Sequence, residues 1–468
     1  MSRKKKLPLL ENIEITDVAA EGKSIARVEN QVLFVQGLVP GDIADIQVIR
    51  KRKRFMEGRV VTLKKLSEER ETPFCGHFGI CGGCKWQVLP YEKQLYYKKA
   101  QVSDQLKRLG KVEIPPIKVI RGSEFQRFYR NKLEFTFSAN RWLNDEEIQS
   151  GDNFTDRRAL GFHLQGKFDR VFNVEKCYLQ HELSNRILNE IRQYTLNNDY
   201  SYYHQRNTTG LLRNLIIRNT SLDQWMVIIV FREQQEEKIS GLMEHVRKQF
   251  PELNSLLYVI NPKVNDTIND LEVKVYSGHD HIFEEFDGLR FKIGPKSFFQ
   301  TNIMQARELY RMTSVLAELK GDEVVYDLYT GTGTIANYIA GNCRKVIGIE
   351  YIPEAIEDAW ANAALNQIEN VEFFAGDIKN LLNSDFVAKN GTPDVVITDP
   401  PRAGMHTDVV EAIIEARPEK IIYISCNPAT QARDVQILDS HYRVYEVQPV
   451  DMFPHTQHVE NIIRLDRK

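Results

Sequence analysis

The feature that most constrains the fold is a short apolar stretch near the carboxyl end of the chain. Ile421–Ile424 is a run of four β-favouring side chains, as in a buried strand. Pro428 bars continued strand pairing soon afterwards, and Ser425 and Asn427 favour a turn. Cys426 is therefore predicted to lie at the carboxyl end of a central strand, where α/β sheets bind ligands. Taken alone, such a cysteine is more often a small buried apolar residue than a nucleophile.

Strands and helices alternate around this stretch, which predicts a Rossmann-like α/β domain over residues 289–468. The first strand runs into the glycine-rich loop Thr330–Thr334, where glycines let the backbone approach a ligand closely. The second strand ends in Glu350, an acid placed to hold a ribose diol. The loop lacks the third glycine of the pyrophosphate fingerprint, which favours S-adenosylmethionine over a dinucleotide. The expected strands are 324–329, 346–350, 371–374, 394–398 and 421–424.

Residues 1–68 form a separate and basic unit. Residues 10–66 alternate apolar and polar side chains in short runs broken by glycine, which predicts an OB-like barrel of about five strands. Residues 1–66 carry 14 lysines and arginines against 8 acids, a net charge of +6, whereas the whole chain carries −2. We interpret this asymmetry and the run Arg50–Arg54 as an RNA contact, the alternative being a solvated loop. The unit resembles a TRAM domain, an RNA-binding barrel of RNA-modifying enzymes.

Four of the six cysteines form one set. Cys75, Cys81 and Cys84 lie within ten residues, on a loop whose glycines allow the backbone to wrap, and Cys177 follows much later. Four thiolates suit either tetrahedral zinc or an iron–sulfur cluster. Zinc sites usually pair two short Cys-x-x-Cys hooks, so three cysteines on one loop and one remote cysteine favour a [4Fe–4S] cluster. Disulfides are disfavoured in a chain expected to be cytoplasmic.

The intervening residues, 69–288, are predicted to form an α+β domain. A long antiparallel sheet with helices is expected over about 71–285. One amphipathic helix is expected over 91–110, as a candidate to pack on the catalytic domain, and another over 183–195. Five cations are candidates for an RNA path, or else ordinary surface charges: Arg127, Arg130, Lys132, Arg213 and Arg218.

Composition bounds the class of protein. Apolar residues make up 42% of the chain and charged residues 27%, as in soluble globular proteins. No apolar run approaches the roughly 20 residues that span a bilayer, and no apolar signal core follows the basic start Met1–Lys6. We expect a cytoplasmic monomer with no membrane contact and, from its length, about three domains.

Five motifs, in order along the chain, resemble those of the RNA uracil-5-methyltransferases. With the barrel and the cysteine loop, the resemblance covers most of the chain. It is closest to the 23S rRNA branch, whose members carry the iron–sulfur cluster, whereas the tRNA branch typically lacks it. Thr334 stands where many relatives have asparagine. The motifs are Lys296–Asn302, Asp327–Gly333, Asp399–Gly404, Ser425–Pro428 and Pro454–Glu460.

The resemblance implies methyl transfer from S-adenosylmethionine to C5 of a uridine, in 23S rRNA first and tRNA second. Uracil C5 is a poor nucleophile until a thiolate adds to C6, and Cys426 is the expected nucleophile. Glu460 is the expected base that removes the C5 proton, so that the thiolate can leave. Glu460 as a plain surface carboxylate is the alternative, which the apolar strand Val459–Ile463 disfavours.

The resemblance also implies a set of residues around the cofactor. Asp399 and Gln300 are expected between cofactor and base, where they can bond the uracil edge. A base in folded RNA must be flipped out to reach such a pocket. The expected cofactor-binding residues are Gln300, Tyr329, Thr334, Glu350, Asp377 and Asp399.

Two other functions remain open. One is a tRNA uracil-5-methyltransferase, against which the cysteine loop argues. The other is a non-catalytic RNA-binding protein with an iron–sulfur sensor, which needs neither Cys426 nor Glu460. DNA amino-methyltransferases also use an Asp-Pro-Pro motif, but they typically end it with an aromatic residue, and here Arg402 follows.

Overall fold

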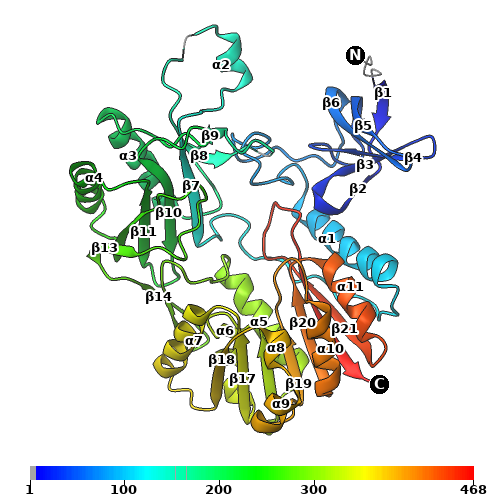
Figure 1. The fold of residues 1–468 in the computed structure, drawn as a ribbon. Helices are drawn as coiled ribbons and strands as arrows, with labels where there is room; N and C mark the ends of the chain where they lie inside the picture. Colours follow the sequence, from blue (N-terminus) through cyan, green and yellow to red (C-terminus); the bar gives the residue numbers. More distant parts are fainter. Residues whose placement is uncertain (1–6, 153, 165) are drawn as a thin grey trace.

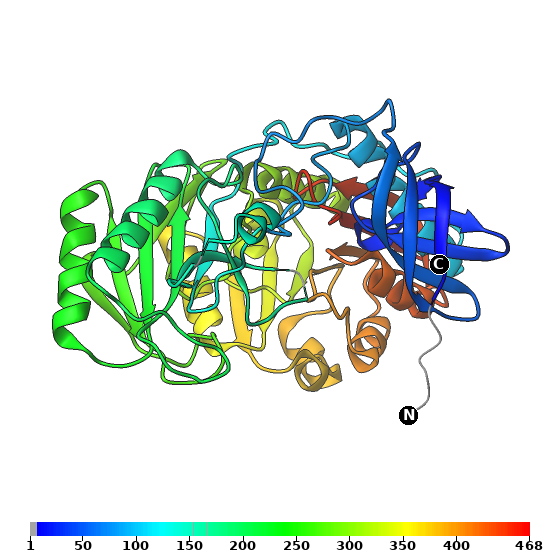
Figure 2. The same ribbon diagram turned by 90° about the horizontal axis from the view of Figure 1, so that it is seen from above.

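The computed structural model describes residues 7–152, 154–164 and 166–468. It contains three large sheets, which follow one another along the chain (Figure 1). The N-terminal sheet lies beside the C-terminal part of the chain, and the central sheet lies on the far side of the molecule (Figure 2). The basic start Met1–Lys6 is outside the described residues.

The N-terminal sheet has six strands in the order β1-β5-β6-β4-β3-β2. The strand-rich unit is as predicted, with six strands where about five were expected, because the two-residue β2 pairs with the end of β3. Alternate side chains bury a small core that includes Leu33, Ala44 and Ile46. The strands are β1 (Leu9–Glu14), β2 (Asp17–Val18), β3 (Ser24–Val28), β4 (Gln31–Val35), β5 (Ile43–Lys51) and β6 (Phe55–Lys65).

The central sheet has seven strands in the order β13-β12-β11-β10-β7-β8-β9. The prediction of a purely antiparallel sheet is wrong at one pair, since β11 and β12 run parallel. The helix α4 joins these two strands, and a helical crossover returns the chain to start a parallel strand. A hairpin, β14–β15, then leads into the last domain. The strands are β7 (Lys132–Ser138), β8 (Ala159–His163), β9 (Val171–Asn173), β10 (Leu212–Asn219), β11 (Trp225–Phe231), β12 (Ser255–Ile260), β13 (Val273–Gly278), β14 (Ile282–Phe286) and β15 (Leu289–Ile293).

The C-terminal sheet is Rossmann-like, in the order β18-β17-β16-β19-β20-β22-β21. Its first five strands in that order are parallel, as predicted, and β22 inserts antiparallel between β20 and β21. Carboxyl ends of parallel strands meet at one edge, so the predicted site residues gather there. The strands are β16 (Val324–Leu328), β17 (Lys345–Glu350), β18 (Val371–Ala375), β19 (Val395–Thr398), β20 (Lys420–Ser425), β21 (Tyr442–Val450) and β22 (Glu460–Arg467).

The strand β20 shows why its sequence is continuously apolar. Ile422 and Ile424 pack into the core on one face of the sheet, and Ile421 and Tyr423 pack into the core on the other. A strand covered by helices on both faces has no polar side, which is the pattern of parallel sheets. No helix among the described residues is long and apolar enough to cross a membrane.

Helices cover the sheets of the central and C-terminal regions (Figure 1). Helix α1 precedes the central sheet in the chain. Its residues Val102 and Leu106 nevertheless join the core on the face of the C-terminal sheet that buries Ile421 and Tyr423. Its last turn widens to a π-helix over Leu106–Gly110. The helices are α1 (Tyr91–Gln105), α2 (Asp145–Gln149), α3 (Glu182–Asn197), α4 (Glu236–Gln249), α5 (Ile303–Ala317), α6 (Thr334–Ile339), α7 (Pro353–Leu365), α8 (Ile378–Leu381), α9 (Ser384–Asn390), α10 (Thr407–Ala416) and α11 (Pro428–Leu438), with short 3-10 turns at Ala20–Gly22 and Ala340–Asn342.

Candidate functional site

Cys426 lies in the turn between β20 and α11. The Ser425 hydroxyl accepts the Asn427 N–H at 3.1 Å, and the Asn427 side chain caps α11 by accepting the Ala429 N–H at 3.1 Å. The Asn427 amide also donates to the Arg402 carbonyl at 3.0 Å, which ties this turn to the loop after β19. These bonds hold the half-buried thiol at the carboxyl edge of the sheet.

Three ionisable groups surround the Cys426 thiol. Burial, followed by the Glu460 and Asp399 carboxylates, raises its pKa to about 11, against the lowering effect of the Arg402 guanidinium. Burial and the Asp399 charge together raise the pKa of Glu460 to about 8. The structure thus brings both predicted catalytic residues and Asp399 together. Pairs of groups whose pKa values are shifted toward neutrality are typical of acid–base sites.

Two residues that were not among the predicted site residues, Asp327 and Tyr310, lie near these acids. Burial and, to a lesser extent, the Asp327 carboxylate raise the pKa of Asp399 to about 7. Tyr310, buried on α5, lies near Asp399, Asp327 and Glu460, whose charges add to the upward shift that burial imposes on its pKa. Tyr310 is a polar residue on the apolar, core-facing stripe of α5, and this is the signal that could have found it.

The loop after β16 is shaped for close approach of a ligand. Asp327, at 1% exposure, accepts the Thr330 hydroxyl through Oδ2 at 2.5 Å, while its Oδ1 has no hydrogen-bond partner among the described residues. Gly331 has φ +55°, and a β-carbon there would meet no atom within 4 Å. The Gly331 N–H donates to Glu350 Oε2 at 3.2 Å. An unpartnered buried carboxylate oxygen beside open backbone fits a bound polar ligand.

Three of the predicted cofactor residues lie together beside this loop. Burial, followed by the nearby Asp434, Asp377 and Glu350 carboxylates, raises the pKa of Tyr329 to about 12. Asp377 caps α8 by accepting the Lys379 N–H at 3.2 Å. The carboxylates that end β17 and follow β18 therefore lie near one tyrosine, at the edge where α/β sheets bind ligands.

Thr334 and Gln300, which are also predicted cofactor residues, are held by different contacts. Thr334 is the first residue of α6, and its hydroxyl lies 3.2 Å from that of Thr332. Gln300 lies before α5, where its carbonyl accepts the Asn131 side-chain amide at 3.0 Å. The Gln300 side chain makes no hydrogen bond to another described residue, so the structure leaves it free to meet a ligand.

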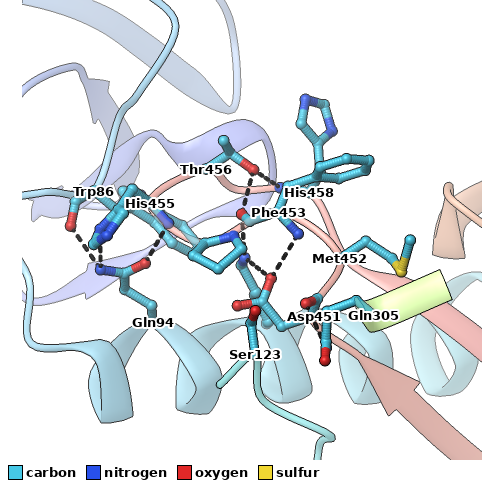
Figure 3. Close-up of polar contacts among 12 residues, drawn as sticks. Trp86, Gln94, Ser123, Gln305, Asp451, Met452, Phe453, His455, Thr456 and His458 are labelled. Atoms are coloured by element: carbon cyan, nitrogen blue, oxygen red, sulfur yellow. Dashed lines mark hydrogen bonds and ion pairs between the residues drawn. The ribbon is translucent and has the colours of Figure 1, made fainter. Parts of the chain in front are cut away.

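The loop before Glu460 is joined to the cysteine loop (Figure 3). The N–H groups of Lys85 and Trp86, directly after Cys84, donate to the His455 carbonyl at 2.9 and 3.0 Å. The Phe74 ring contacts the His455 ring edge-on, with 5.0 Å between centroids. Burial lowers the pKa of His455 to about 4, so this imidazole is neutral and serves as a packed, hydrogen-bonding side chain.

The four predicted metal-ligating cysteines line a single cavity of about 530 Å³. Burial and, to a lesser extent, the neighbouring thiols raise the pKa of Cys84 to about 12 and that of Cys177 to about 11. Among the residues that the structure describes, no three or more His, Cys, Asp or Glu side chains are arranged to hold a metal ion. A donor set of four thiols around one cavity fits a cluster, which keeps its ligands farther apart than a single ion does.

The basic run of the N-terminal unit lies at the β5–β6 hairpin. Residues 50–54 are all exposed, and Gln31 donates to the carbonyls of Arg52 and Lys53 at 2.9 and 3.0 Å. Arg50 lies 3.5 Å from Glu57. Of the cations proposed for an RNA path, Arg213 and Arg218 are buried and bond backbone carbonyls, so these two are structural.

Two protein-family models match this chain. The family described as tRNA (Uracil-5-)-methyltransferase matches residues 285–468, and the TRAM domain matches residues 11–61. A protein of Bacteroides thetaiotaomicron named as an uncharacterized RNA methyltransferase is 54% identical over 452 residues, which is 96% of this chain and all of that protein. One of the same name from Porphyromonas gingivalis is 53% identical and covers 97% of this chain and 99% of its own.

A solved structure extends the likeness to three dimensions. The Pyrococcus abyssi tRNA (uracil-54, C5)-methyltransferase in complex with S-adenosyl-L-homocysteine matches with a TM-score of 0.74 and 26% identity. The match covers 97% of this chain and 100% of that protein. The likeness therefore extends over the N-terminal, central and C-terminal regions of the fold.

Proposed function

Because the chain belongs to the RNA uracil-5-methyltransferase family, we propose that it transfers a methyl group from S-adenosylmethionine to C5 of a uridine in RNA. The observation that carries the proposal is the meeting of Cys426, Glu460 and Asp399 at one sheet edge. A thiol beside two acids of raised pKa supplies both a nucleophile and a base. Neither group is needed by a protein that only binds RNA.

The methyl donor fits the loop after β16. S-adenosylmethionine supplies an electrophilic methyl group when bound. Glu350 and Asp377 are proposed to accept the ribose hydroxyls and the adenine amine, with Tyr329 packed beside them. The free Oδ1 of Asp327 and the open space at Gly331 support binding of the amino-acid end of the donor. Thr334 at the first turn of α6 completes the set.

Cys426 is proposed to act first. Its sulfur bonds to uracil C6 while the C5=C6 electron pair shifts toward O4, and the thiol proton leaves to solvent. Burial and two carboxylates hold the free thiol protonated, and Arg402 opposes them. Arg402 is thus the positive charge beside the forming thiolate. Asp399 and Gln300 are proposed to bond the uracil edge, which fixes C6 next to the sulfur.

Glu460 is proposed to act last. C5 then bears both a methyl group and its original proton. The Glu460 carboxylate takes that proton, the C5=C6 bond reforms, and the sulfur leaves as thiolate. A pKa near 8 suits a base that works near neutral pH, because the acceptor must be ionised and still hold a proton well.

The cysteine loop is proposed to hold a [4Fe–4S] cluster through Cys75, Cys81, Cys84 and Cys177. The spacing of three cysteines on one loop supports it, as does the cavity that all four line. Such a cluster contributes to folding of the loop or to redox sensing, and no step of methyl transfer passes through it. Zinc is the alternative that metal analysis distinguishes.

We propose 23S rRNA as the first target to test and tRNA as the second. The cysteine loop and the motifs resemble the rRNA branch, whereas the likeness to the P. abyssi enzyme, whose name gives tRNA uracil-54 as its substrate, favours tRNA. Mapping 5-methyluridine in both RNAs from a strain that lacks the gene decides between them. Loss of the modification from rRNA alone supports the first target.

The mechanism is tested with Cys426→Ala and Glu460→Gln on radiolabelled RNA in a denaturing gel. Cys426→Ala should abolish methylation and form no adduct. Glu460→Gln keeps the nucleophile but cannot take the C5 proton, so methylated RNA should stay attached to Cys426 as a slow band. Cys343→Ala, at a buried cysteine in the core, is the matched control and should methylate normally.

Three results contradict this assignment. They are normal turnover by Glu460→Gln, normal methylation by Cys426→Ala, and an adduct that persists when both residues are replaced. The last result would place the covalent bond on another residue. Normal methylation by Cys426→Ala would favour a route to methyl transfer that needs no thiolate at this position.

A further inference from the structure

One face of helix α1 is polar although it is buried. Tyr91, Gln94 and Lys98 are three and four residues apart, so they lie on one side of the helix. All three contact the segment 451–455, in the loop between β21 and β22 that precedes Glu460. A helix that merely packs on a sheet presents apolar side chains there, as Val102 and Leu106 do one turn later.

The central contact is an ion pair between Lys98 and Asp451, both with side chains at 0% exposure. Lys98 Nζ donates to Asp451 Oδ1 at 2.5 Å and to the Phe453 carbonyl at 3.0 Å. Asp451 Oδ2 accepts the Tyr91 hydroxyl at 2.8 Å, and its Oδ1 accepts the Phe453 N–H at 3.1 Å. The pair therefore fixes both the side chain and the main chain of the loop.

Gln94 fixes the same loop further along (Figure 3). Its Oε1 accepts the His455 N–H at 2.8 Å, and its Nε2 lies 3.2 Å from His455 Nδ1. From the other side, Gln305 of α5 donates to the Asp451 carbonyl at 2.8 Å. The Asn302 amide donates to the Met452 carbonyl at 3.0 Å. Residues 451–455 are thus held between two helices from different parts of the chain.

The loop leads directly to the proposed base. Val450 and Glu460 face each other in the β21–β22 register, so residues 451–459 form a closed loop whose two ends lie side by side. Glu460 is 6% exposed, and its carboxylate makes no hydrogen bond to any other described residue. Its position is therefore set by its backbone, which pairs with Val450 where the loop closes.

Burying two charges has a large desolvation cost, and an apolar pair of similar size is often no less stable. A contribution to stability is therefore a weak explanation for this ion pair. Buried ion pairs are better explained, in the systems where a role is known, by their fixing of one unique geometry. We propose that Lys98 and Asp451 are positioning residues that hold the 451–459 loop so that Glu460 can reach the C5 proton. The inference rests on the proposed function of Glu460 and adds α1 to the catalytic apparatus.

The informative variant removes both charges together. Lys98→Met/Asp451→Asn leaves no unpaired buried charge, and asparagine still offers an oxygen to Tyr91 or Phe453. The Phe453 carbonyl keeps two donors, the N–H and hydroxyl of Thr456 at 3.2 and 2.8 Å. The fold should therefore survive. Lys98→Met alone strands the Asp451 charge and should unfold at a lower temperature.

The measurement separates methyl transfer from proton removal in one reaction. RNA carrying tritium at uracil C5, isolated from a strain that lacks the gene, is incubated with the double variant and a labelled methyl donor. First-turnover methyl transfer should stay within about twofold of wild type. Tritium release should fall about 10- to 100-fold, because a shift of about 1 Å in a catalytic group costs that much. Methylated RNA should accumulate on Cys426.

The control is the exposed pair on the same helix. Asp104→Asn/Arg108→Met removes an ion pair of 3.4 Å whose side chains are 58% and 77% exposed, and should leave both rates unchanged. Equal loss of methyl transfer and tritium release in the Lys98/Asp451 double variant, or no loss of either, overturns the positioning role. If Glu460→Gln itself releases tritium at the wild-type rate, the proposed base is wrong, and that failure is distinct.

Discussion

Two cysteine regions of this protein contrast in how their positions are determined. Cys426 follows a buried parallel strand and is held by bonds within the turn that it belongs to. The loop of Cys75, Cys81 and Cys84 lies between β6 and α1, where the chain forms turns and irregular structure. Its partner Cys177 comes from beyond β9, about 90 residues later.

Each part of the four-cysteine site is held by a bond within its own segment, and one long-range bond joins the two parts. The Cys75 N–H donates to Gln87 Oε1 at 3.2 Å, and the Cys177 N–H donates to Asn185 Oδ1 at 2.8 Å. His77 Nε2 accepts the Glu175 N–H at 3.1 Å, which joins the two halves. A cysteine at a strand end is thus placed by its local fold, whereas the four-cysteine site requires long-range closure, whose entropic cost a bound cluster would offset.

The largest expected effect comes from replacing one cysteine in each of the two regions and comparing the results. Cys84→Ser should reduce iron from about four per chain to near zero and lower the unfolding temperature, because one thiolate ligand is lost. Cys426→Ala should keep all the iron and its brown absorbance while losing methylation. Iron analysis and thermal unfolding of anaerobically purified protein provide the measurement.

Two outcomes would contradict the contrast between these regions. Stoichiometric zinc with no iron rejects the cluster, and iron loss in Cys426→Ala contradicts their independence. Since Lys85 and Trp86, directly after Cys84, bond the His455 carbonyl, Cys84→Ser is also expected to slow the proton removal that we propose for Glu460.

The effect of intermediate size is the pH dependence of stability. It arises because the Glu460 carboxyl group, near Cys426, is buried. Burial raises the pKa of Glu460 from about 4.3 in the unfolded chain to about 8 in the folded protein. Its stabilising contribution is complete below pH of about 4 and is lost as pH rises through about 8. Wild type should therefore lose more stability than Glu460→Gln between pH of about 5 and 9, on the order of a few kcal/mol.

Thermal or denaturant unfolding at both ends of that range measures the difference. The lowered pKa values of His455 and His458 act with the opposite sign, but both proteins contain these residues, so their effect cancels in the comparison. Parallel stability curves for the two proteins would show that Glu460 is ionised freely in the fold.

The smallest expected effect lies in the basic β5–β6 hairpin of the N-terminal unit. Neutralising Arg52, Lys53 and Arg54 should weaken RNA binding and reduce the slope of log affinity against log salt by about 2, at about 0.7 per phosphate contact. Binding titrations at several salt concentrations provide the slope. Arg247→Gln/Lys248→Gln on α4, on the opposite side of the molecule in Figure 1, is the control and should leave it unchanged. Equal slopes for all three proteins reject the RNA contact.

The sequence by itself determined the Rossmann-like sheet and the places of most site residues along it. Continuous runs of β-favouring apolar residues such as Ile421–Ile424 are typical of strands covered on both faces, and parallel strands bring their carboxyl ends to one edge. Cys426, Glu350 and Asp377 follow such strands, so their neighbourhood was predictable. The resemblance of the motif Pro454–Glu460 indicated Glu460, and the structure places this residue at the start of a strand that pairs with β20.

Only the tertiary structure decided which remote groups surround these residues. The parallel β11–β12 pair, the carboxylates around Tyr310, and the burial of Lys98 against Asp451, more than 350 residues away, follow from packing between elements. Local periodicity carries no information about such distant partners, and the sequence alone does not distinguish a buried lysine from an exposed one. Burial and a partner's charge arise only when the chain folds, and these two quantities set pKa values and geometry at the site.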